Sequence, residues 1–183
     1  MRVFFIGICG TAMGNAAILL KKQGHEVAGS DLGVYPPMSD VLSKAGIELF
    51  EGFEDRVMRD WKPDRVVVGN AVSRGNSQVE FILSTRKIPF VSLPQLIGED
   101  LIESRPCLVV AGTHGKTTTT SLSAFALEQV GLSPGYLVGG VPLDLPSGNE
   151  LGIKESPFVI EGDEYDSAFL INGVNLFTTV PVF

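Results

Sequence analysis

Cysteine is scarce in this chain, and long apolar runs are absent. Cys9 and Cys107 are the only cysteines among 183 residues, too few for a disulfide framework or a cysteine-rich metal site. The apolar stretch at residues 1–7 is too short for the core of a signal peptide and leads directly into a glycine turn. No run reaches the length that spans a membrane. These absences argue against a disulfide-rich secreted domain and a membrane-spanning protein, and they favour a reducing, cytoplasmic compartment.

Basic residues are also few. Fourteen lysines and arginines stand against twenty-one acidic residues, and the net charge of −7 disfavours a nucleic-acid scaffold, although a local basic site stays open. The hydrophobic content of 44% is enough for a packed core. The chain is therefore expected to be globular, with one large or two small domains.

The most informative stretch is residues 107–120, CLVVAGTHGKTTTT, in which an apolar run breaks into a glycine-flanked turn that ends in Lys-Thr. This order predicts a buried strand, a phosphate-binding loop and the start of a helix, and therefore a nucleoside triphosphate site. The general pattern would place a glycine five positions before Gly115, where this chain has Val110. A glycine- and threonine-rich connector without a ligand is the alternative.

Each residue type in this loop suits phosphate chemistry. Gly112 and Gly115 let backbone amides approach phosphate oxygens. Lys116 supplies a mobile positive charge for the outer phosphates, and Thr117 offers a hydroxyl to Mg2+ from the first helical turn. His114 is expected to contact substrate or phosphate as a neutral imidazole, or else to cap the loop. The predicted ATP-binding residues are Gly112, Thr113, His114, Gly115, Lys116, Thr117 and Thr118.

A second glycine turn, residues 7–14, follows the first expected strand. A strict dinucleotide fingerprint needs glycines at positions 7, 9 and 12, and this chain has Gly7, Cys9 and Ala12. Backbone amides and the following helix can still hold a pyrophosphate there. Asp31 ends the next strand, where a carboxylate can accept a ribose hydroxyl. A turn-forming cap is the alternative for Asp31.

Two nucleotide sites in one chain favour an enzyme that joins a nucleotide-carried substrate to ATP chemistry. A dehydrogenase is the rival class. It would use only the first turn and Asp31, and it leaves the second loop unexplained.

Four acidic residues lie within residues 161–166, EGDEYD, directly after the apolar run 157–160. A strand that ends in a carboxylate one βα unit after a phosphate loop brings that carboxylate beside the Lys-Thr of the loop, where Mg2+ is held. We therefore predict Thr117 and Glu161 as metal ligands, and Lys116, Glu161 and His114 as catalytic residues. A solvated acidic loop is the alternative.

Short apolar runs alternate with helical patterns along the chain, which is typical of parallel βα units. We expect an α/β fold with an N-terminal Rossmann-like parallel-sheet domain, residues 1–103, and the first part of a P-loop ATPase domain, residues 104–183. The expected strands are residues 3–6, 26–29, 47–50, 65–70, 88–91, 107–111 and 157–161, and the expected helices are one that ends near residue 23 and residues 38–45, 78–85, 94–102 and 117–130.

These motifs resemble those of the Mur ligases, the ATP-dependent amide-forming enzymes of peptidoglycan synthesis. Residues 112–118, GTHGKTT, look like that family's form of the phosphate loop, which accounts for Val110. The resemblance covers residues 1 to about 169, and it is carried also by residues 8–14, 30–31, 34–39, 69–76, 139–142 and 161–166.

The resemblance implies that the first domain binds UDP-N-acetylmuramate. The substrate-binding residues that it implies are Gly7, Cys9, Gly10, Thr11, Met13, Ser30, Asp31, Asn70, Ser73, Arg74 and Asn76. For the last four, a polar turn after a strand is the alternative. The details of the motifs favour family members that attach L-alanyl-γ-D-glutamyl-meso-diaminopimelate in peptidoglycan recycling. Members that attach L-alanine are the alternative.

The implied reaction uses ATP and Mg2+. The muramate carboxylate attacks the γ-phosphate to give an acyl phosphate, and the incoming amine then displaces phosphate. Lys116 and Mg2+ would stabilise charge on the transferring group. Neither a nucleic acid nor a membrane is expected as a partner.

Mur ligases have three domains and more than twice this length, so the resemblance implies an incomplete ligase that binds nucleotides and does not ligate by itself. A non-catalytic nucleotide-binding fragment is therefore a further alternative. We also expect residues 170–183 to be read out of frame, because LING at 170–173 and FTTVP at 177–181 correspond to family codons read with a shift of one base.

Overall fold

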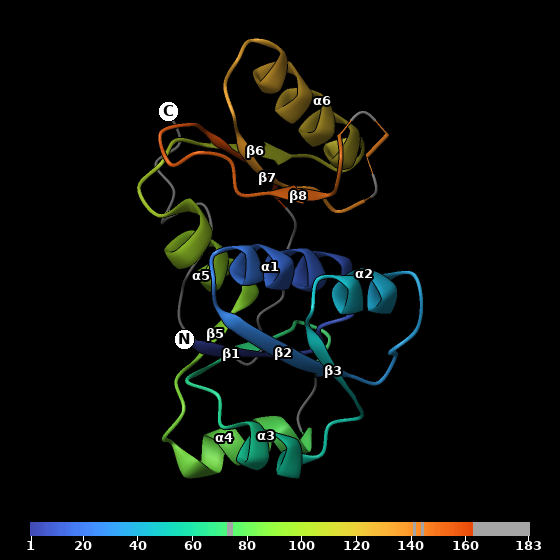
Figure 1. Cartoon of the computed structure of the whole chain (residues 1–183), viewed down its shortest axis with the longest axis vertical. Coiled ribbons are helices and arrows are strands. Elements are labelled where there is room, and N and C mark those ends of the chain that lie inside the picture. The colour runs from blue at the N-terminus through green and yellow to red at the C-terminus, as the bar shows by residue number, and fades with distance from the viewer. Residues whose placement is uncertain (73–74, 141, 144, 163–183) are drawn as a thin grey trace.

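The computed structural model describes residues 1–72, 75–140, 142–143 and 145–162, which form two β-sheets (Figure 1). The first sheet has the strand order β3-β2-β1-β4-β5 and the second β6-β9-β7-β8. The strands are β1 (Arg2–Ile6), β2 (Glu26–Asp31), β3 (Glu48–Glu51), β4 (Arg65–Val68), β5 (Phe90–Ser92), β6 (Cys107–Ala111), β7 (Gly135–Leu137), β8 (Asn149–Glu150) and β9 (Phe158–Gly162). The helices are α1 (Thr11–Lys22), α2 (Met38–Lys44), α3 (Asp55–Trp61), α4 (Ser77–Thr85), α5 (Leu93–Leu96), the π-helix η1 (Ile97–Ile102) and α6 (Lys116–Gln129).

All neighbouring strands of the first sheet run parallel. Helices cover both faces, with α1 and α2 on one side and α3 and α4 on the other (Figure 1), which is why β1 and β4 are almost wholly apolar. Successive β1 side chains point to opposite faces. Phe5 belongs to the cluster that contains α1, whereas Phe4 packs on Trp61 of α3 with 5.5 Å between the ring centroids.

The second sheet has one helix on each face. β6, β9 and β7 are parallel, and β8 pairs antiparallel with β7. α6 covers the face that is uppermost in Figure 1, and α1 lies below the other face. Leu137 of β7 and Ile160 of β9 share a buried apolar cluster with Leu19 of α1. The helix that follows the first glycine turn therefore packs against both sheets.

The burial of α1 follows from this position. Eight consecutive residues, 13–20, are buried, whereas a surface helix buries a single stripe. Gly14 lies at the contact between α1 and α2, and a Cβ placed there would lie 2.5 Å from Met38 Sδ. A side chain at this position would force the two helices or the Met38 side chain to move.

Residues 103–106 connect the two sheets, and Arg105 fixes this connection to the second sheet. Its guanidinium donates to the carbonyl oxygens of Leu151 at 2.9 Å and Ser156 at 3.2 Å. It also lies 5.0 Å from the centroid of the Phe158 ring. Lys154 adds an ion pair with Glu103 at 3.3 Å.

The helices around the first sheet differ from the expectations in three details. α1 begins at Thr11, so the first glycine turn is shorter than expected and Gly14 belongs to the helix. α3 is a helix that the sequence analysis did not predict, although Val57, Met58 and Trp61 have the spacing of one helical face. The helix expected at residues 94–102 is present, but its second half has π-helical geometry.

Two more differences concern the second sheet. β7 and β8 were not predicted, because strands of three and two residues are too short to give a periodic signal. β6 was expected to be buried and is only half-buried, with Leu108 43% exposed. β6 lies at the edge of the sheet in the described part of the chain, so one side of the strand has no neighbour there.

None of the described helices has the length and apolar character needed to cross a bilayer.

Packing between the sheets predicts a large stability effect at Leu19. This side chain is fully buried, so Leu19→Ala is expected to lower the free energy of unfolding by about 3 kcal/mol through lost burial and a residual cavity. Urea unfolding followed by circular dichroism measures the change. Leu122→Ala on α6 is the matched control, because Leu122 is 55% exposed and its loss is expected to cost less than about 0.5 kcal/mol. Equal effects of the two substitutions would contradict the central position of α1.

Candidate nucleotide-binding site

The predicted phosphate loop lies between β6 and α6. β6 ends at Ala111 and α6 begins at Lys116. Gly115 adopts a φ of +78° at the N-cap, a conformation that glycine tolerates and other residues rarely adopt. Within the described part of the chain no side-chain hydrogen bond caps α6, so the first backbone N–H groups of the helix are available there to an anion.

The side chains of the loop are close to its backbone. Lys116 Nζ donates to the carbonyl oxygen of Gly112 at 2.9 Å, and His114 Nδ1 lies 3.3 Å from Thr113 Oγ1. Residues 112–115 are exposed. A solvent-exposed loop with a lysine folded over it can receive a phosphate chain from outside.

Glu161 lies beside this loop although it is 44 residues away from Thr117 in sequence. β9 pairs with β6 so that Glu161 stands opposite Val110, and Thr117 Oγ1 donates to Glu161 Oε2 at 3.1 Å. The other carboxylate oxygen, Oε1, accepts from the backbone N–H of Gly139 at 2.7 Å. Glu161 is only 6% exposed, and these two donors compensate a carboxylate that has lost most of its water.

The donor set at this point suits Mg2+. The ion commonly takes one or two carboxylates, keeps several waters and uses phosphate oxygens for the rest of its octahedral shell. Glu161 supplies a carboxylate and Thr117 a hydroxyl oxygen, 3.1 Å apart. The described residues contain no group of three or more His, Cys, Asp and Glu that could hold a metal without other ligands. Asp163, Glu164 and Asp166 of the acidic segment lie outside the described residues.

A cavity of about 720 Å³ opens at the carboxyl ends of β1, β2 and β4, the edge at which open parallel sheets bind ligands. Asp31 organises its floor. Its Oδ2 accepts from the backbone N–H of Cys9 at 2.8 Å, and its Oδ1 accepts from that of Gly33 at 3.1 Å. The second contact is the turn-forming cap that was the alternative for Asp31, and the same residue also lines the cavity.

The structure brings most of the predicted substrate-binding residues together. The cavity is lined by Gly7, Cys9, Gly10, Thr11, Met13, Asp31 and Asn70. Two others lie elsewhere. Ser30 is fully buried and its Oγ donates to Gln78 Oε1 at 2.5 Å, because alternation along β2 turns its side chain away from the cavity. Asn76 caps α4 by accepting from the backbone of Gln78 and Val79, as the turn alternative supposed. Ser73 and Arg74 lie outside the described residues.

Sequence reasoning missed the apolar wall of the cavity and its contribution from the second sheet. Leu32 and Tyr35 are 71% and 69% exposed at this site. The further lining residues that were not predicted are Ala12, Gly33, Pro37, Met38, Phe53, Gly69, Ala71, Val72, Leu93, Gly139 and Gly140. The motifs at residues 34–39 and 139–142 were signals that could have found several of them. Because Gly139 also donates to Glu161, the cavity reaches the candidate metal site.

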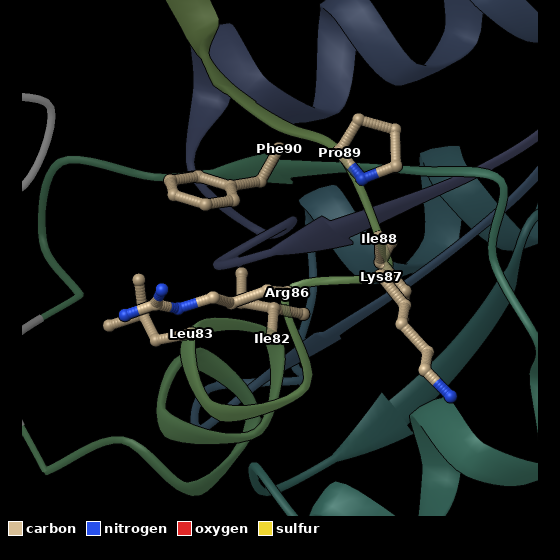
Figure 2. A pocket seen from close by; sticks show the side chains of 7 residues that line it. All are labelled: Ile82, Leu83, Arg86, Lys87, Ile88, Pro89 and Phe90. Carbon is tan, nitrogen blue, oxygen red and sulfur yellow. The ribbon is translucent and has the colours of Figure 1, made fainter.

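A second hollow, of about 730 Å³, lies at the connection between α4 and β5 (Figure 2). Apolar side chains dominate its lining, which includes Ile82, Leu83 and Phe90, with Arg86 and Lys87 as the charged members. α4 is on the face of the first sheet opposite α1 (Figure 1), so this hollow is remote from the phosphate loop. Among the residues that the structure describes, its lining includes no Asp, Glu, His or Cys.

Comparisons with known proteins identify the family. The family model described as "Mur ligase family, catalytic domain" matches residues 2–104. The chain belongs to the Mur ligase family. It is 49% identical over 169 residues to the UDP-N-acetylmuramate–L-alanyl-γ-D-glutamyl-meso-2,6-diaminoheptanedioate ligase of Escherichia coli strain K12, which covers 92% of this chain and 36% of that protein.

Solved structures show the same likeness. A murein peptide ligase from Psychrobacter arcticus has a TM-score of 0.86 and 41% identity, and the match covers 91% of this chain and 38% of that one. A UDP-N-acetylmuramate–alanine ligase from Thermotoga maritima has a TM-score of 0.78 and 29% identity, over 88% of this chain and 36% of that one. This Mur ligase chain therefore spans about a third of the length of the curated relatives that it matches.

The environment of Cys9 predicts a sluggish thiol. Burial, and then the negative charge of Asp31, raise the pKa of Cys9 to about 11, so the reactive thiolate forms only at strongly alkaline pH. At pH 8 iodoacetamide is expected to alkylate Cys9 about a hundredfold more slowly than an unperturbed cysteine. Mass spectrometry of the Cys9 peptide, with the urea-unfolded chain as control, measures the two rates. Equal rates in the folded and unfolded chain would contradict this environment.

Proposed function

We propose that this chain is the UDP-N-acetylmuramate- and ATP-binding part of an ATP-dependent ligase that attaches L-alanyl-γ-D-glutamyl-meso-diaminopimelate to UDP-N-acetylmuramate. Residues 1–103 form the UDP-sugar domain and residues 104–183 belong to the ATP domain. The observation that carries the proposal is the hydrogen bond between Thr117 and Glu161. It joins a phosphate loop to a buried carboxylate, and the glycine beside that carboxylate lines the cavity of the first sheet.

The loop residues have complementary roles in this proposal. Backbone amides at the uncapped start of α6 and the Lys116 ammonium hold the outer phosphates of ATP. Thr117 Oγ1 and Glu161 Oε2 would hold Mg2+, which when bound neutralises charge on the phosphates. His114 stands in the exposed loop beside Thr113, where it can contact the incoming carboxylate.

The cavity of the first sheet positions the other substrate. The backbone turn at residues 7–10 and the Asp31 carboxylate that braces it would receive the UDP portion, and the muramate carboxylate would then point toward Gly139 and Gly140. That carboxylate takes the γ-phosphoryl group of ATP and ADP leaves. The amine of the peptide then displaces phosphate from the acyl phosphate and forms the amide bond.

The identity of the amine substrate rests on the relatives. The chain is 49% identical to a ligase named for the tripeptide and 37% identical to an L-alanine ligase from Psychrobacter, so we propose the tripeptide, with L-alanine as the second candidate. A cytoplasmic location is proposed on the basis of the two free cysteines, Cys9 and Cys107.

Phosphate release tests the proposed reaction in a form extended to the length of the family's members. With UDP-N-acetylmuramate and Mg2+-ATP, the tripeptide is expected to support faster turnover than L-alanine. Lys116→Ala is expected to lower turnover at least about a hundredfold, because one transition-state contact of this kind is worth roughly 3 kcal/mol. The matched control is Lys154→Ala, which removes only an exposed ion pair with Glu103. Turnover with L-alanine alone would select the second candidate, and full turnover in Lys116→Ala would overturn the assignment of the loop.

The candidate metal site predicts a specific change in Glu161→Gln. The amide keeps an oxygen for Gly139 but loses the negative charge that attracts Mg2+. The Mg2+ concentration that half-saturates ATP binding is therefore expected to rise, while UDP-N-acetylmuramate binding stays unchanged. Isothermal titration calorimetry of each ligand measures both quantities. An unchanged Mg2+ dependence would leave Glu161 as a structural acid that only holds Thr117 and Gly139.

A further inference from the structure

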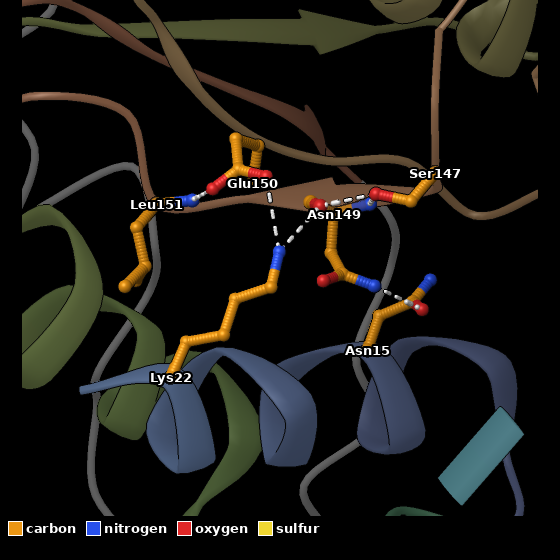
Figure 3. A network of polar contacts seen from close by, with 6 residues as sticks. All are labelled: Asn15, Lys22, Ser147, Asn149, Glu150 and Leu151. Atoms are coloured by element: carbon orange, nitrogen blue, oxygen red, sulfur yellow. Dashed lines mark hydrogen bonds and ion pairs between the residues drawn. The ribbon is translucent and has the colours of Figure 1, made fainter. Parts of the chain in front are cut away.

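Asn15 is a buried polar residue on the helix that separates the two sheets. It lies in α1, one turn beyond the start of the helix at Thr11, and only 5% of it is exposed. Figure 3 shows Asn15 and Lys22 extending from α1 toward β8, where they meet Asn149 and Glu150. Burying a side-chain amide costs free energy that hydrogen-bond partners for its donor and acceptor offset.

Both ends of the Asn15 amide have partners in the second sheet. Asn15 Nδ2 donates to the carbonyl oxygen of Val138 at 3.1 Å. Asn15 Oδ1 accepts from Asn149 Nδ2 at 2.9 Å. These contacts join residues more than a hundred positions apart in sequence. They place a side chain of α1 against the segment that follows β7.

One peptide group links Asn15 to Glu161. Its carbonyl, from Val138, accepts from Asn15, and its N–H, from Gly139, donates to Glu161. The Val138 carbonyl and the Gly139 N–H belong to one planar amide and point in opposite directions. The carbonyl faces Asn15, and the N–H donates to Glu161 Oε1 at 2.7 Å. A rotation of this peptide plane would break both hydrogen bonds together.

We propose that Asn15 is a positioning residue for Glu161, acting through the Val138–Gly139 peptide group. Its donation to the carbonyl fixes the plane and polarises the amide, which strengthens the bond from Gly139 to the carboxylate. The carboxylate is thereby held with its second oxygen, Oε2, turned toward Thr117. The link to Mg2+ rests on the proposed function, whereas the orientation of the peptide does not.

Lys22 provides a matched comparison on the same helix. Its Nζ forms an ion pair with Glu150 Oε2 at 3.0 Å, with side chains that are 38% and 41% exposed, and donates to the backbone carbonyl oxygen of Asn149 at 3.4 Å. This contact also ties α1 to β8 (Figure 3), but it does not touch the Val138–Gly139 peptide. If Asn15 only holds α1 against the second sheet, removing the Lys22 contact should affect Glu161 as much as removing the Asn15 contact does.

Amide hydrogen exchange of the 183-residue chain, resolved by NMR, tests the orientation directly. Asn15→Leu is expected to raise the exchange rate of the Gly139 amide at least about tenfold, since its hydrogen bond to Glu161 is no longer held in place. Lys22→Met is expected to leave that rate unchanged. Asn15→Asp is the second variant should Asn15→Leu fail to fold, because it keeps an acceptor for Asn149 and lacks the donor for Val138.

Binding of Mn2+ in the presence of ATP, followed by the electron paramagnetic resonance of the free ion, tests the consequence. The Asn15 variants are expected to bind Mn2+ about tenfold more weakly, as for outer-shell partners of metal ligands, and Lys22→Met to bind it normally. Wild-type exchange at Gly139 in the Asn15 variants would overturn the proposal. So would unchanged Mn2+ affinity despite faster exchange, or an equal effect of Lys22→Met. If the unmodified chain binds no Mn2+ with ATP, the proposed metal site fails, and the exchange rates alone decide the role of Asn15.

Discussion

The burial of α1 between two β-sheets is the constraint on which the rest of the structure depends. Residues 13–20 are buried without interruption, so the helix cannot move relative to one sheet without disturbing its packing on the other. Its first turn borders the cavity of the first sheet, and its flank contacts β7 and β8. Any change in the relation between the two sheets therefore acts first on this helix.

The candidate site lies where two sheets of mainly parallel strands present carboxyl ends to a common region. Gly139 and Gly140 line the cavity of the first sheet, and Gly139 also donates to Glu161 beside the phosphate loop. A ligand carboxylate in that cavity and a phosphate chain on the loop would thus meet at the end of β7. In the proposed reaction, such closeness would supply the orientation that phosphoryl transfer needs.

The parts of this architecture that depend on local sequence could be predicted from it. The glycines and the Lys-Thr pair predicted a strand, a turn and a helix start, which β6 and α6 confirm, and the βα order correctly placed Thr117 next to Glu161. The directions of side chains were harder to predict. The alternation along β2 turns Ser30 away from the cavity toward Gln78, and Asn76 is used as the N-cap of α4. Contacts such as that between Asn15 and Asn149 join segments that are distant in sequence. The periodic pattern within either segment does not predict such contacts.

The shape of the cavity depends on the absence of a Cβ atom at Gly14. The space that its Cβ would need is occupied by the Met38 side chain, and Met38 is itself part of the cavity wall. A methyl group introduced at Gly14 would displace the flexible Met38 thioether and change the shape of the cavity, although Gly14 itself does not line it. The spacing between α1 and α2 therefore sets the size of the cavity. A substitution at Gly14 could change ligand specificity although Gly14 is not among the residues that line the cavity.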